Sequence, residues 1–195
     1  MKISLKKCVS FAILLTISFI TSAQSPKLSG KYLLVIDMQE NGTKYTLEPA
    51  HAKSLLEKVN MVISKADTDK VLYVEAIMAR LGISLTKLTV DFEPGMALDD
   101  RLTLVGNTRI VKTEANSFSA EQLQHFIKET GASDFVIVGL MAEHCIRATA
   151  LGGIQEGYSM SVIPEAIAAE SEQSKAETMS ELQKAGVNIL SLEEL

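Results

Sequence analysis

Short apolar runs rich in β-branched residues alternate along the chain with longer segments whose apolar residues recur at helical spacing. Such runs are typical of strands buried on both faces of a parallel sheet. They occupy residues 32–36, 71–74, 108–111, 135–138, 159–163 and 187–190. The segments at helical spacing predict helices over residues 49–66, 119–129, 143–156 and 171–184. This alternation predicts a single α/β domain whose parallel sheet is covered by helices on both faces.

Turn and cap residues indicate where several of these helices begin and end. Pro49 suits the first turn of a helix, and Ser119 is a typical N-cap residue. Gly131 is suited to end the helix that follows Ser119. The stretch from Ala76 to Asn107 is irregular and contains Pro94-Gly95, so we expect mostly loop with at most one short helix.

The first 23 residues have the pattern of a secretory signal peptide. Three lysines precede an apolar run from Val9 to Ile20, and the small residues Thr21-Ser22-Ala23 follow it. A positive segment, a short apolar segment and a small-residue cleavage site occur in this order in secretory signals. We therefore predict cleavage after Ala23 and a secreted or periplasmic domain over residues 24–195. A buried N-terminal helix and an uncleaved anchor are the alternatives, although the apolar run is shorter than a bilayer requires.

The composition fits one folded domain of ordinary size. The 195 residues are 47% hydrophobic and 22% charged, which argues against intrinsic disorder. The net charge of −5 makes a nucleic-acid partner unfavourable on electrostatic grounds. Removal of the signal would take away three lysines, no acidic residue and Cys8, which leaves a charge of −8 and Cys145 as the lone thiol. A lone thiol in an exported protein is a buried bystander, an intermolecular bridge or a reactive group.

Three ionisable or nucleophilic side chains follow predicted strands, at the edge where open parallel sheets bind their ligands. Asp37 follows the first strand, Lys112 follows the third, and Cys145 lies just beyond the fourth at the start of a helix. A helix start offers unpaired N–H groups and a positive dipole end, and both favour the nucleophilic thiolate. Asp37 could accept the proton of the thiol, and Lys112 could pair with Asp37 and stabilise developing negative charge.

Each of these residues also has an ordinary structural explanation. Cys145 could be a buried structural cysteine, Asp37 a turn residue, and Lys112 a solvated lysine. Taken singly, the three signals are weak. Their joint position at one edge of the sheet is what favours a catalytic group.

The sequence contains no recognisable metal or cofactor motif. The three histidines are His51, His125 and His144, and the stretch from Ala76 to Asn107 contains none. Zinc sites require clustered His, Cys or carboxylate ligands. Neither a dinucleotide fingerprint nor a phosphate-binding loop occurs. We therefore predict no metal and no cofactor, and we expect His144, beside the cysteine, to line a pocket.

Three ordered motifs resemble the isochorismatase-like cysteine hydrolase superfamily. They are Leu34–Gln39, Lys112–Phe118 and Gly139–Cys145, followed by shorter similarities at Thr149-Ala150, Glu156–Tyr158 and Pro164–Ala166. The resemblance spans nearly all of the chain after residue 23. It implies a three-layer αβα (Rossmann-like) fold with a six-stranded parallel sheet.

The resemblance also implies a catalytic triad. In it Cys145 is the nucleophile, Asp37 the general base and Lys112 its charged partner. The peptide between Leu140 and Met141 is commonly cis in this superfamily, which would direct the backbone N–H groups of Met141 and Cys145 at an oxyanion. Members with the full triad usually hydrolyse amides, including nicotinamide and N-carbamoyl compounds, through a thioester. Members that act on isochorismate generally lack the cysteine.

The chain departs from the pattern of the superfamily near the expected pocket. Glu40-Asn41-Gly42 replaces the common Asn-Asp-Phe after Gln39, which removes an aromatic pocket wall. Nicotinamidases carry a metal site with two histidines after the second strand, where this chain has none. By position alone, the residues expected to bind substrate are Glu75, Met78, Asn116, Phe118, Glu143 and His144.

These observations together predict an exported hydrolase that cleaves a C–N bond of a small amide or carbamoyl compound. The expected partner is a small-molecule substrate, with no nucleic acid and, after signal cleavage, no membrane, while assembly into a homo-oligomer stays open. Two other functions fit the same residues. One is a non-catalytic domain that binds a small ligand, and the other is a redox protein that uses a single thiol.

Overall fold

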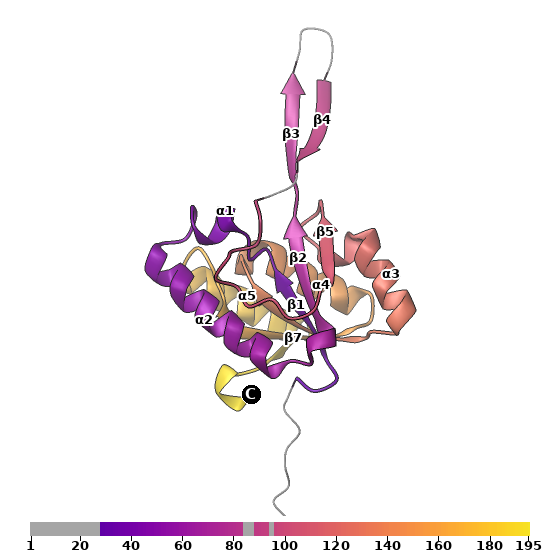
Figure 1. Ribbon diagram of the computed structural model, residues 1–195. Helices are drawn as coiled ribbons and strands as arrows, with labels where there is room; N and C mark the ends of the chain where they lie inside the picture. Colours follow the sequence, from indigo (N-terminus) through magenta and orange to yellow (C-terminus); the bar gives the residue numbers. More distant parts are fainter. Residues whose placement is uncertain (1–27, 84–87, 94–95) are drawn as a thin grey trace, which may run out of the picture.

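Six strands form one parallel sheet, which confirms the predicted fold class (Figure 1). The computed structural model describes residues 28–83, 88–93 and 96–195, so the predicted signal peptide lies outside the described residues. The strands are β1 (Tyr32–Ile36), β2 (Val71–Ala76), β5 (Arg109–Lys112), β6 (Asp134–Gly139), β7 (Ser159–Ile167) and β8 (Asn188–Ile189). Their order across the sheet is β5-β2-β1-β6-β7-β8, and every neighbouring pair is parallel.

Helices cover both faces of this sheet and complete three layers (Figure 1). They are α1 (Glu40–Thr43), α2 (Pro49–Lys65), α3 (Glu121–Thr130), α4 (Arg147–Gln155) and α5 (Glu172–Lys184), and a π-helix η3 (Ala142–Ile146) leads directly into α4. On one face, the predicted apolar stripe of α2, which includes Leu55 and Val59, packs against β1, β6 and β7. On the other face, α3, α4 and α5 enclose a second buried cluster. No described helix is both long and apolar enough to cross a bilayer.

The structure confirms some of the predicted helix ends and corrects others. Pro49 is the first residue of α2, and Gly131 has φ +68° at the C-terminal cap of α3. Ser119 is not the N-cap of α3. It is the last residue of a short 3-10 turn, Ser117–Ser119, which is capped by Asn116, whose side chain accepts the N–H of Phe118. The helix α3 therefore begins only after Ala120. The predicted helix over 143–156 divides into η3 and α4, and the predicted last strand shortens to β8.

The prediction that residues 76–107 form mostly loop is wrong. Strands β3 (Met78–Ile83) and β4 (Leu88–Glu93) pair antiparallel in a hairpin that stands out from the body of the domain (Figure 1). The strands form because apolar residues recur at every second position along both segments, as is typical of strands. In the register of the pair, apolar residues lie opposite each other, as with Leu81 and Val90. The chain then returns over the face of the sheet to β5.

A buried amide holds the root of this hairpin. The Gln39 side chain is 2% exposed and donates to the carbonyls of Ala76, at 3.1 Å, and Met96, at 2.7 Å. It also accepts the N–H of Ala76 at 2.9 Å. One side chain at the end of β1 therefore ties together the two points where the hairpin leaves and rejoins the domain.

The buried carboxylate of Asp99 lies next to this root, and its removal should destabilise the fold. Hydrogen bonds from Arg101 and from the Thr43 hydroxyl outweigh burial and hold the pKa of Asp99 well below its ordinary value. Because that pKa lies below the unfolded value, the stabilisation is complete above about pH 4 and is lost as the pH falls further. We expect Asp99→Ala to lower the free energy of unfolding by about 2 kcal/mol at neutral pH, measured by urea denaturation.

The neighbouring Asp100 provides the matched control. Its side chain is 75% exposed and pairs with Lys44 at the surface. Asp100→Ala should therefore change the free energy of unfolding by less than about 0.5 kcal/mol. Equal losses in the two variants would show that the buried bonds of Asp99 do not stabilise the fold.

Candidate active site

Three strand ends bring the predicted reactive side chains to the carboxyl edge of the sheet. Asp37 directly follows β1, and Lys112 is the last residue of β5. Cys145 lies in η3, six residues beyond Gly139 at the end of β6. Since β1 and β6 are neighbours and β5 lies one strand beyond β2, parallel pairing places all three ends on one side.

One ammonium group contacts both of the other side chains. Lys112 Nζ lies 3.0 Å from Asp37 Oδ2 and 3.0 Å from Cys145 Sγ. The Lys112 side chain is 1% exposed and that of Asp37 is 12% exposed, while Cys145 is half-buried. A buried lysine is rare unless it is paired, and here its partners are a carboxylate and a thiol. The structure thus assembles the three residues that the sequence singled out.

Asp37 has an unusual backbone conformation at the end of β1. Its φ is +54°, in the left-handed region, where Asp is tolerated better than most residues other than glycine. Its N–H donates to the carbonyl of Val74 at 2.9 Å, which anchors the turn to β2. Among the described residues, its Oδ1 is buried without a hydrogen-bond partner. That oxygen is free to accept a proton or a hydrogen bond from a bound molecule.

The surroundings of Cys145 disfavour its thiolate form. Burial raises the pKa of Cys145, the charge of Asp37 and a hydrogen bond to Asp37 raise it further, and Lys112 only partly opposes them. This corrects the expectation that a helix start would favour the thiolate, because burial of the sulfur and the nearby carboxylate of Asp37 outweigh that effect. The proton of the thiol accordingly has an acceptor within hydrogen-bonding reach.

The chain between β6 and the thiol follows a tightly fixed path. The peptide between Leu140 and Met141 is cis, as the family resemblance implies. Gly139 has φ +123°, and a Cβ there would collide with the carbonyl oxygen of Ile36, so the position requires glycine. Ala168 bonds to both sides of the cis peptide: its N–H donates to Gly139 at 2.9 Å, and its carbonyl accepts from Ala142 at 2.8 Å. The role of the Met141 and Cys145 N–H groups as an oxyanion site stays a prediction.

Comparison with known proteins identifies the family. The family model described as Isochorismatase domain matches residues 31–194, which is most of the chain. The chain belongs to the isochorismatase family. The predicted superfamily is confirmed, and with it the assignment of the chain as an isochorismatase-family hydrolase domain.

Individual relatives are more distant. The uncharacterized isochorismatase family protein YddQ of Bacillus subtilis (strain 168) is 36% identical over 61 residues, which are 31% of this chain and 34% of that protein. The match thus spans about a third of the length of this curated relative.

Solved structures share the fold. Pyrazinamidase of Pyrococcus horikoshii in complex with zinc has a TM-score of 0.62 at 20% identity, over 83% of this chain and 98% of that one. N-carbamoylsarcosine amidase from Thermoplasma acidophilum has a TM-score of 0.66 at 19% identity, over 85% of this chain and 98% of that one. At these identities the likeness establishes the fold alone.

The residues of this isochorismatase-family chain do not fit a zinc site after β2. Residues 76–107 contain no histidine. In the part of the chain that the structure describes, no three His, Cys, Asp or Glu side chains gather as metal ligands would. A zinc site normally takes three or four such ligands.

Three of the predicted substrate-binding residues have structural partners elsewhere. Phe118 is buried, with its ring 5.3 Å from that of Phe135, and so belongs to the core. Asn116 begins the 3-10 turn and packs closely on Gly152 of α4. Glu75 forms a surface ion pair with Arg109 at 2.7 Å. Among the described residues, none of their hydrogen bonds, ion pairs or ring contacts reaches the triad, so their role in substrate binding stays a prediction.

Of the other three, Glu143 and His144 directly precede the nucleophile in sequence. Glu143 accepts the N–H of Glu170, at 2.9 Å, and the hydroxyl of Ser174, so it fastens η3 to the start of α5. Burial opposes ionisation, but these bonds prevail and keep the pKa of Glu143 below its ordinary value. His144 is exposed and pairs with Glu170 at 3.2 Å. Met78 begins β3, and its side chain lies outside what the structure describes.

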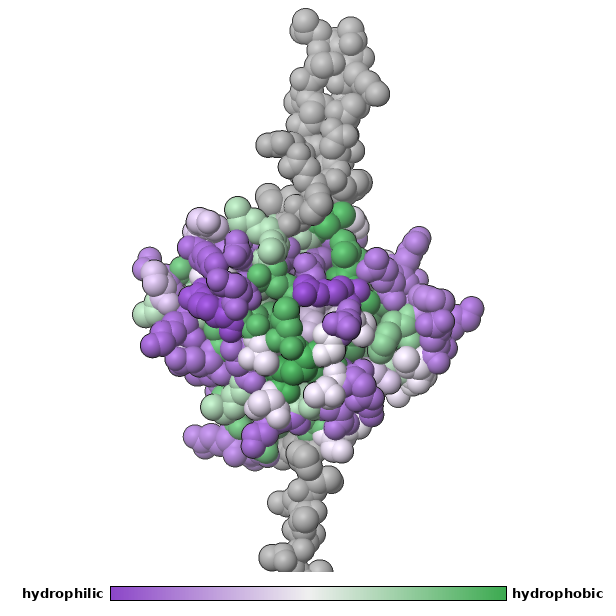
Figure 2. Space-filling view, in the orientation of Figure 1, coloured by the Kyte–Doolittle hydropathy of each residue, from purple (hydrophilic) through white to green (hydrophobic). Residues whose placement is uncertain are grey.

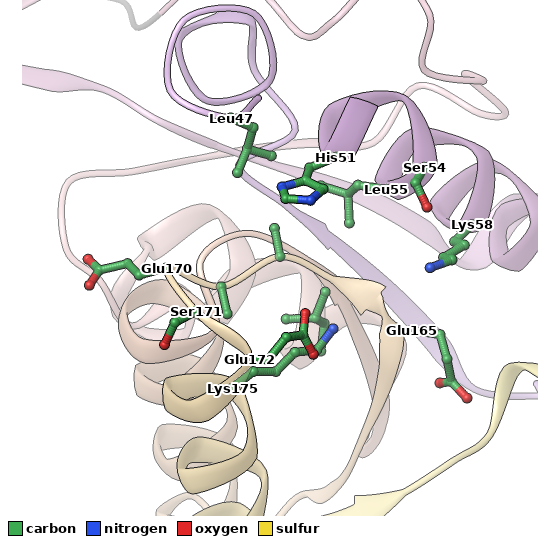
Figure 3. A pocket seen from close by; sticks show the side chains of 13 residues that line it. Leu47, His51, Ser54, Leu55, Lys58, Glu165, Glu170, Ser171, Glu172 and Lys175 are labelled. Atoms are coloured by element: carbon green, nitrogen blue, oxygen red, sulfur yellow. The ribbon is translucent and has the colours of Figure 1, made fainter. Parts of the chain in front are cut away.

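A pocket of about 270 Å³ lies between α2 and the connection from β7 to α5 (Figure 3). Its walls include His51 and Lys58 from α2 and Lys175 from α5, and burial lowers the pKa of Lys175. The triad residues do not line it, yet Ala168, which bonds beside the cis peptide, does. Sequence analysis missed this pocket because its two walls come from segments more than a hundred residues apart.

Proposed function

We propose that this chain is a cysteine hydrolase that cleaves a C–N bond of a small amide or carbamoyl compound through a thioester. The observation that supports this most directly is the single ammonium of Lys112, 3.0 Å from both the Asp37 carboxylate and the Cys145 sulfur. A nucleophile, a base and a fixed positive charge are the parts that acyl transfer requires. Family membership and the fold agree with this reaction class.

The first half of the reaction forms the thioester. Asp37 takes the proton of the Cys145 thiol as the sulfur attacks the carbonyl carbon, and the C=O electron pair moves onto the oxygen. The ammonium of Lys112 holds the resulting negative charges in a site with little water. When the tetrahedral intermediate collapses, the C–N bond breaks and the proton on Asp37 passes to the departing nitrogen, which leaves as ammonia or an amine.

The second half releases the acid. Asp37, again ionised, takes a proton from a water molecule whose oxygen attacks the thioester carbonyl. The C–S bond breaks, the sulfur regains its proton from Asp37, and the carboxylic or carbamic acid leaves. Only the complete cycle restores the starting state, in which the free thiol of Cys145 and the carboxylate of Asp37 both contact the ammonium of Lys112.

We also propose that the enzyme is exported. The support is the order of charged, apolar and small residues in the first 23 positions. In the exported form Cys145 would be the only thiol, so an internal disulfide could not sequester it.

The reaction class can be tested with a panel of small amides, ureides and carbamoyl compounds. We expect at least one to release ammonia or an amine, and rapid acid quenching to trap a covalent adduct whose added mass equals the acyl group. Intact-protein mass spectrometry followed by peptide mapping should place the adduct on Cys145. Turnover without any adduct on this residue under quench conditions that capture known thioesters would contradict the mechanism.

A further inference from the structure

The pocket between α2 and the start of α5 combines an apolar wall with basic side chains (Figure 3). Its volume of about 270 Å³ lies just below the range of about 300–1,000 Å³ that is usual for drug-sized ligands. Its apolar lining residues are Leu47, Leu55, Ile167, Ala168 and Ala169. Ser54 and Lys58 contribute polar groups from α2, and Lys175 contributes an ammonium from α5. The lining therefore suits a small molecule with an apolar part and a charged part.

Two ammonium groups approach each other inside this pocket. Figure 3 shows the side chains of Lys58 and Lys175 pointing toward one another from opposite walls, and both residues are half-buried. Burial lowers the pKa of Lys175, and the charge of Lys58 contributes to this shift. The carboxylates of Glu172, Glu165 and Glu143 oppose the shift without reversing it. Two positive charges at a half-buried place are unfavourable, and an anion bound between them would remove that cost.

The protein itself supplies no anion to these two lysines. Among the described residues, neither of them has a hydrogen bond or an ion pair. The carboxylates in the pocket wall have other surroundings: Glu165 accepts the hydroxyl of Ser191 at 3.4 Å, Glu170 pairs with His144 at 3.2 Å, and Glu172 is exposed. Charged groups that are partly removed from water are normally paired, so these ammonium groups indicate a site for an anion from outside the chain.

Lys58 differs in this respect from the other charged residues of α2. Figure 2 shows mainly hydrophilic residues on the side of the domain where the outer surface of α2 lies. On that surface Lys53 is 75% exposed and pairs with Glu57 at 3.9 Å, and Lys65 is exposed near the end of the helix. Lys58 is the charged residue of this helix that lines the pocket. Its position is therefore not explained by the solvated surface of α2.

We propose that this pocket binds a small carboxylate that carries an apolar group. The carboxylate lies between the ammonium groups of Lys58 and Lys175 and also accepts from the hydroxyl of Ser54, while the apolar group packs against Leu55 and Ile167. A carboxylate can accept charge-assisted hydrogen bonds from both ammonium groups at once, and its charge offsets their mutual repulsion. The triad residues do not line this pocket, so the site is separate from the proposed catalytic site.

The pocket wall favours a monocarboxylate over a more highly charged anion such as phosphate. Glu165, Glu170 and Glu172 all belong to the wall, and their negative charges repel a dianion more strongly than a single carboxylate. The apolar wall also offers phosphate no partner for its remaining oxygens, whereas it can bury the hydrocarbon part of a carboxylic acid. The pocket chemistry therefore selects for one negative charge joined to an apolar body.

Isothermal titration calorimetry tests the proposal, with benzoate and isobutyrate as probes. We expect the wild-type chain to bind at least one of them with a dissociation constant below about 1 mM. The neutral counterparts, benzyl alcohol and isobutanol, should bind at least about 10-fold more weakly, because they lack the charge. Lys58→Met and Lys175→Met each keep an apolar stem and remove one ammonium, so each should weaken carboxylate binding about 10-fold or more. Neither ammonium bonds to the protein, so the melting temperature of the free chain should not fall.

Two lysines at exposed positions of the same helices supply the matched controls. Lys65→Met on α2 and Lys184→Met on α5 remove the same charge outside the pocket and should leave the affinity unchanged. Absence of binding to the wild type, or equal losses in the control variants, overturns the proposal. Tighter binding of inorganic phosphate than of benzoate overturns the carboxylate assignment. Binding that is lost in Lys112→Met but kept in Lys58→Met also contradicts it, since the probe would then lie at the triad. No amide is present, so the result is independent of the proposed hydrolysis.

Discussion

Replacing Cys145 by alanine should abolish hydrolysis of any amide that the wild-type chain turns over. The residue supplies the atom that attacks the carbonyl, and loss of a nucleophile from such a triad lowers kcat by about 10⁴-fold or more. The fold should persist, because the change removes one sulfur atom from a half-buried position. Product release measured under substrate saturation, together with the disappearance of the acyl adduct, checks this expectation.

The other cysteine of the chain serves as the control. Cys8 lies within the predicted signal, and Cys8→Ala should leave turnover unchanged. If Cys145→Ala retained wild-type turnover, the nucleophile would have to be another group. Loss of turnover together with rapid sulfenic acid formation at Cys145 under mild peroxide, and no acyl adduct in the wild type, would instead favour thiol redox chemistry.

The triad could be predicted from the sequence because it depends on features that sequence patterns encode well. The buried strand β1 is a continuous apolar run, so its end is visible where Asp37 interrupts it, and Lys112 likewise ends the short apolar stretch Ile110-Val111 of the edge strand β5. Parallel pairing then brings those ends to one edge whatever the strand order. The thiol follows β6 by the same reasoning.

The electrostatic state of the thiol could not be predicted in this way. It depends on which neighbours lie within hydrogen-bonding reach of the sulfur and on how deeply the sulfur is buried. A helix start by itself indicates a lowered pKa, whereas burial of the sulfur, together with the adjacent carboxylate of Asp37, reverses the direction. Position along the chain could not supply that contact.

Substrate-binding residues were harder to predict for a related reason. Proximity to a motif does not say whether a side chain turns into the site or into the core, and Phe118 turns to the ring of Phe135. The hairpin was missed although its alternation is visible in the sequence, because Pro94-Gly95 indicated a loop. The alternation is explained by the antiparallel pairing of β3 with β4, in which Leu81 lies opposite Val90 in the register.

Lys112→Met should separate the electrostatic role of the lysine from its packing. Methionine preserves the buried apolar stem but removes the charge that contacts both Asp37 and Cys145. Lys112 is the group that lowers the pKa of the thiol, so its loss should raise that pKa further and decrease the thiolate fraction at neutral pH. The inflection in the rate of iodoacetamide labelling should move to higher pH, and kcat/KM for hydrolysis should fall by about 10²–10³-fold.

Arg109→Met is the matched control for Lys112→Met. Arg109 lies on the same strand and also pairs with a carboxylate, Glu75, but it is 43% exposed and its contact is on the other side of β5. Its loss should leave both the labelling profile and kcat/KM close to wild type. If Lys112→Met changed the labelling profile and kcat/KM no more than Arg109→Met does, the charge of Lys112 would contribute to the structure and not to catalysis. If Lys112→Met lost activity without moving the labelling inflection, the ammonium would act on the oxyanion rather than on the thiol, because only a direct effect on the thiol changes its ionisation in the free enzyme.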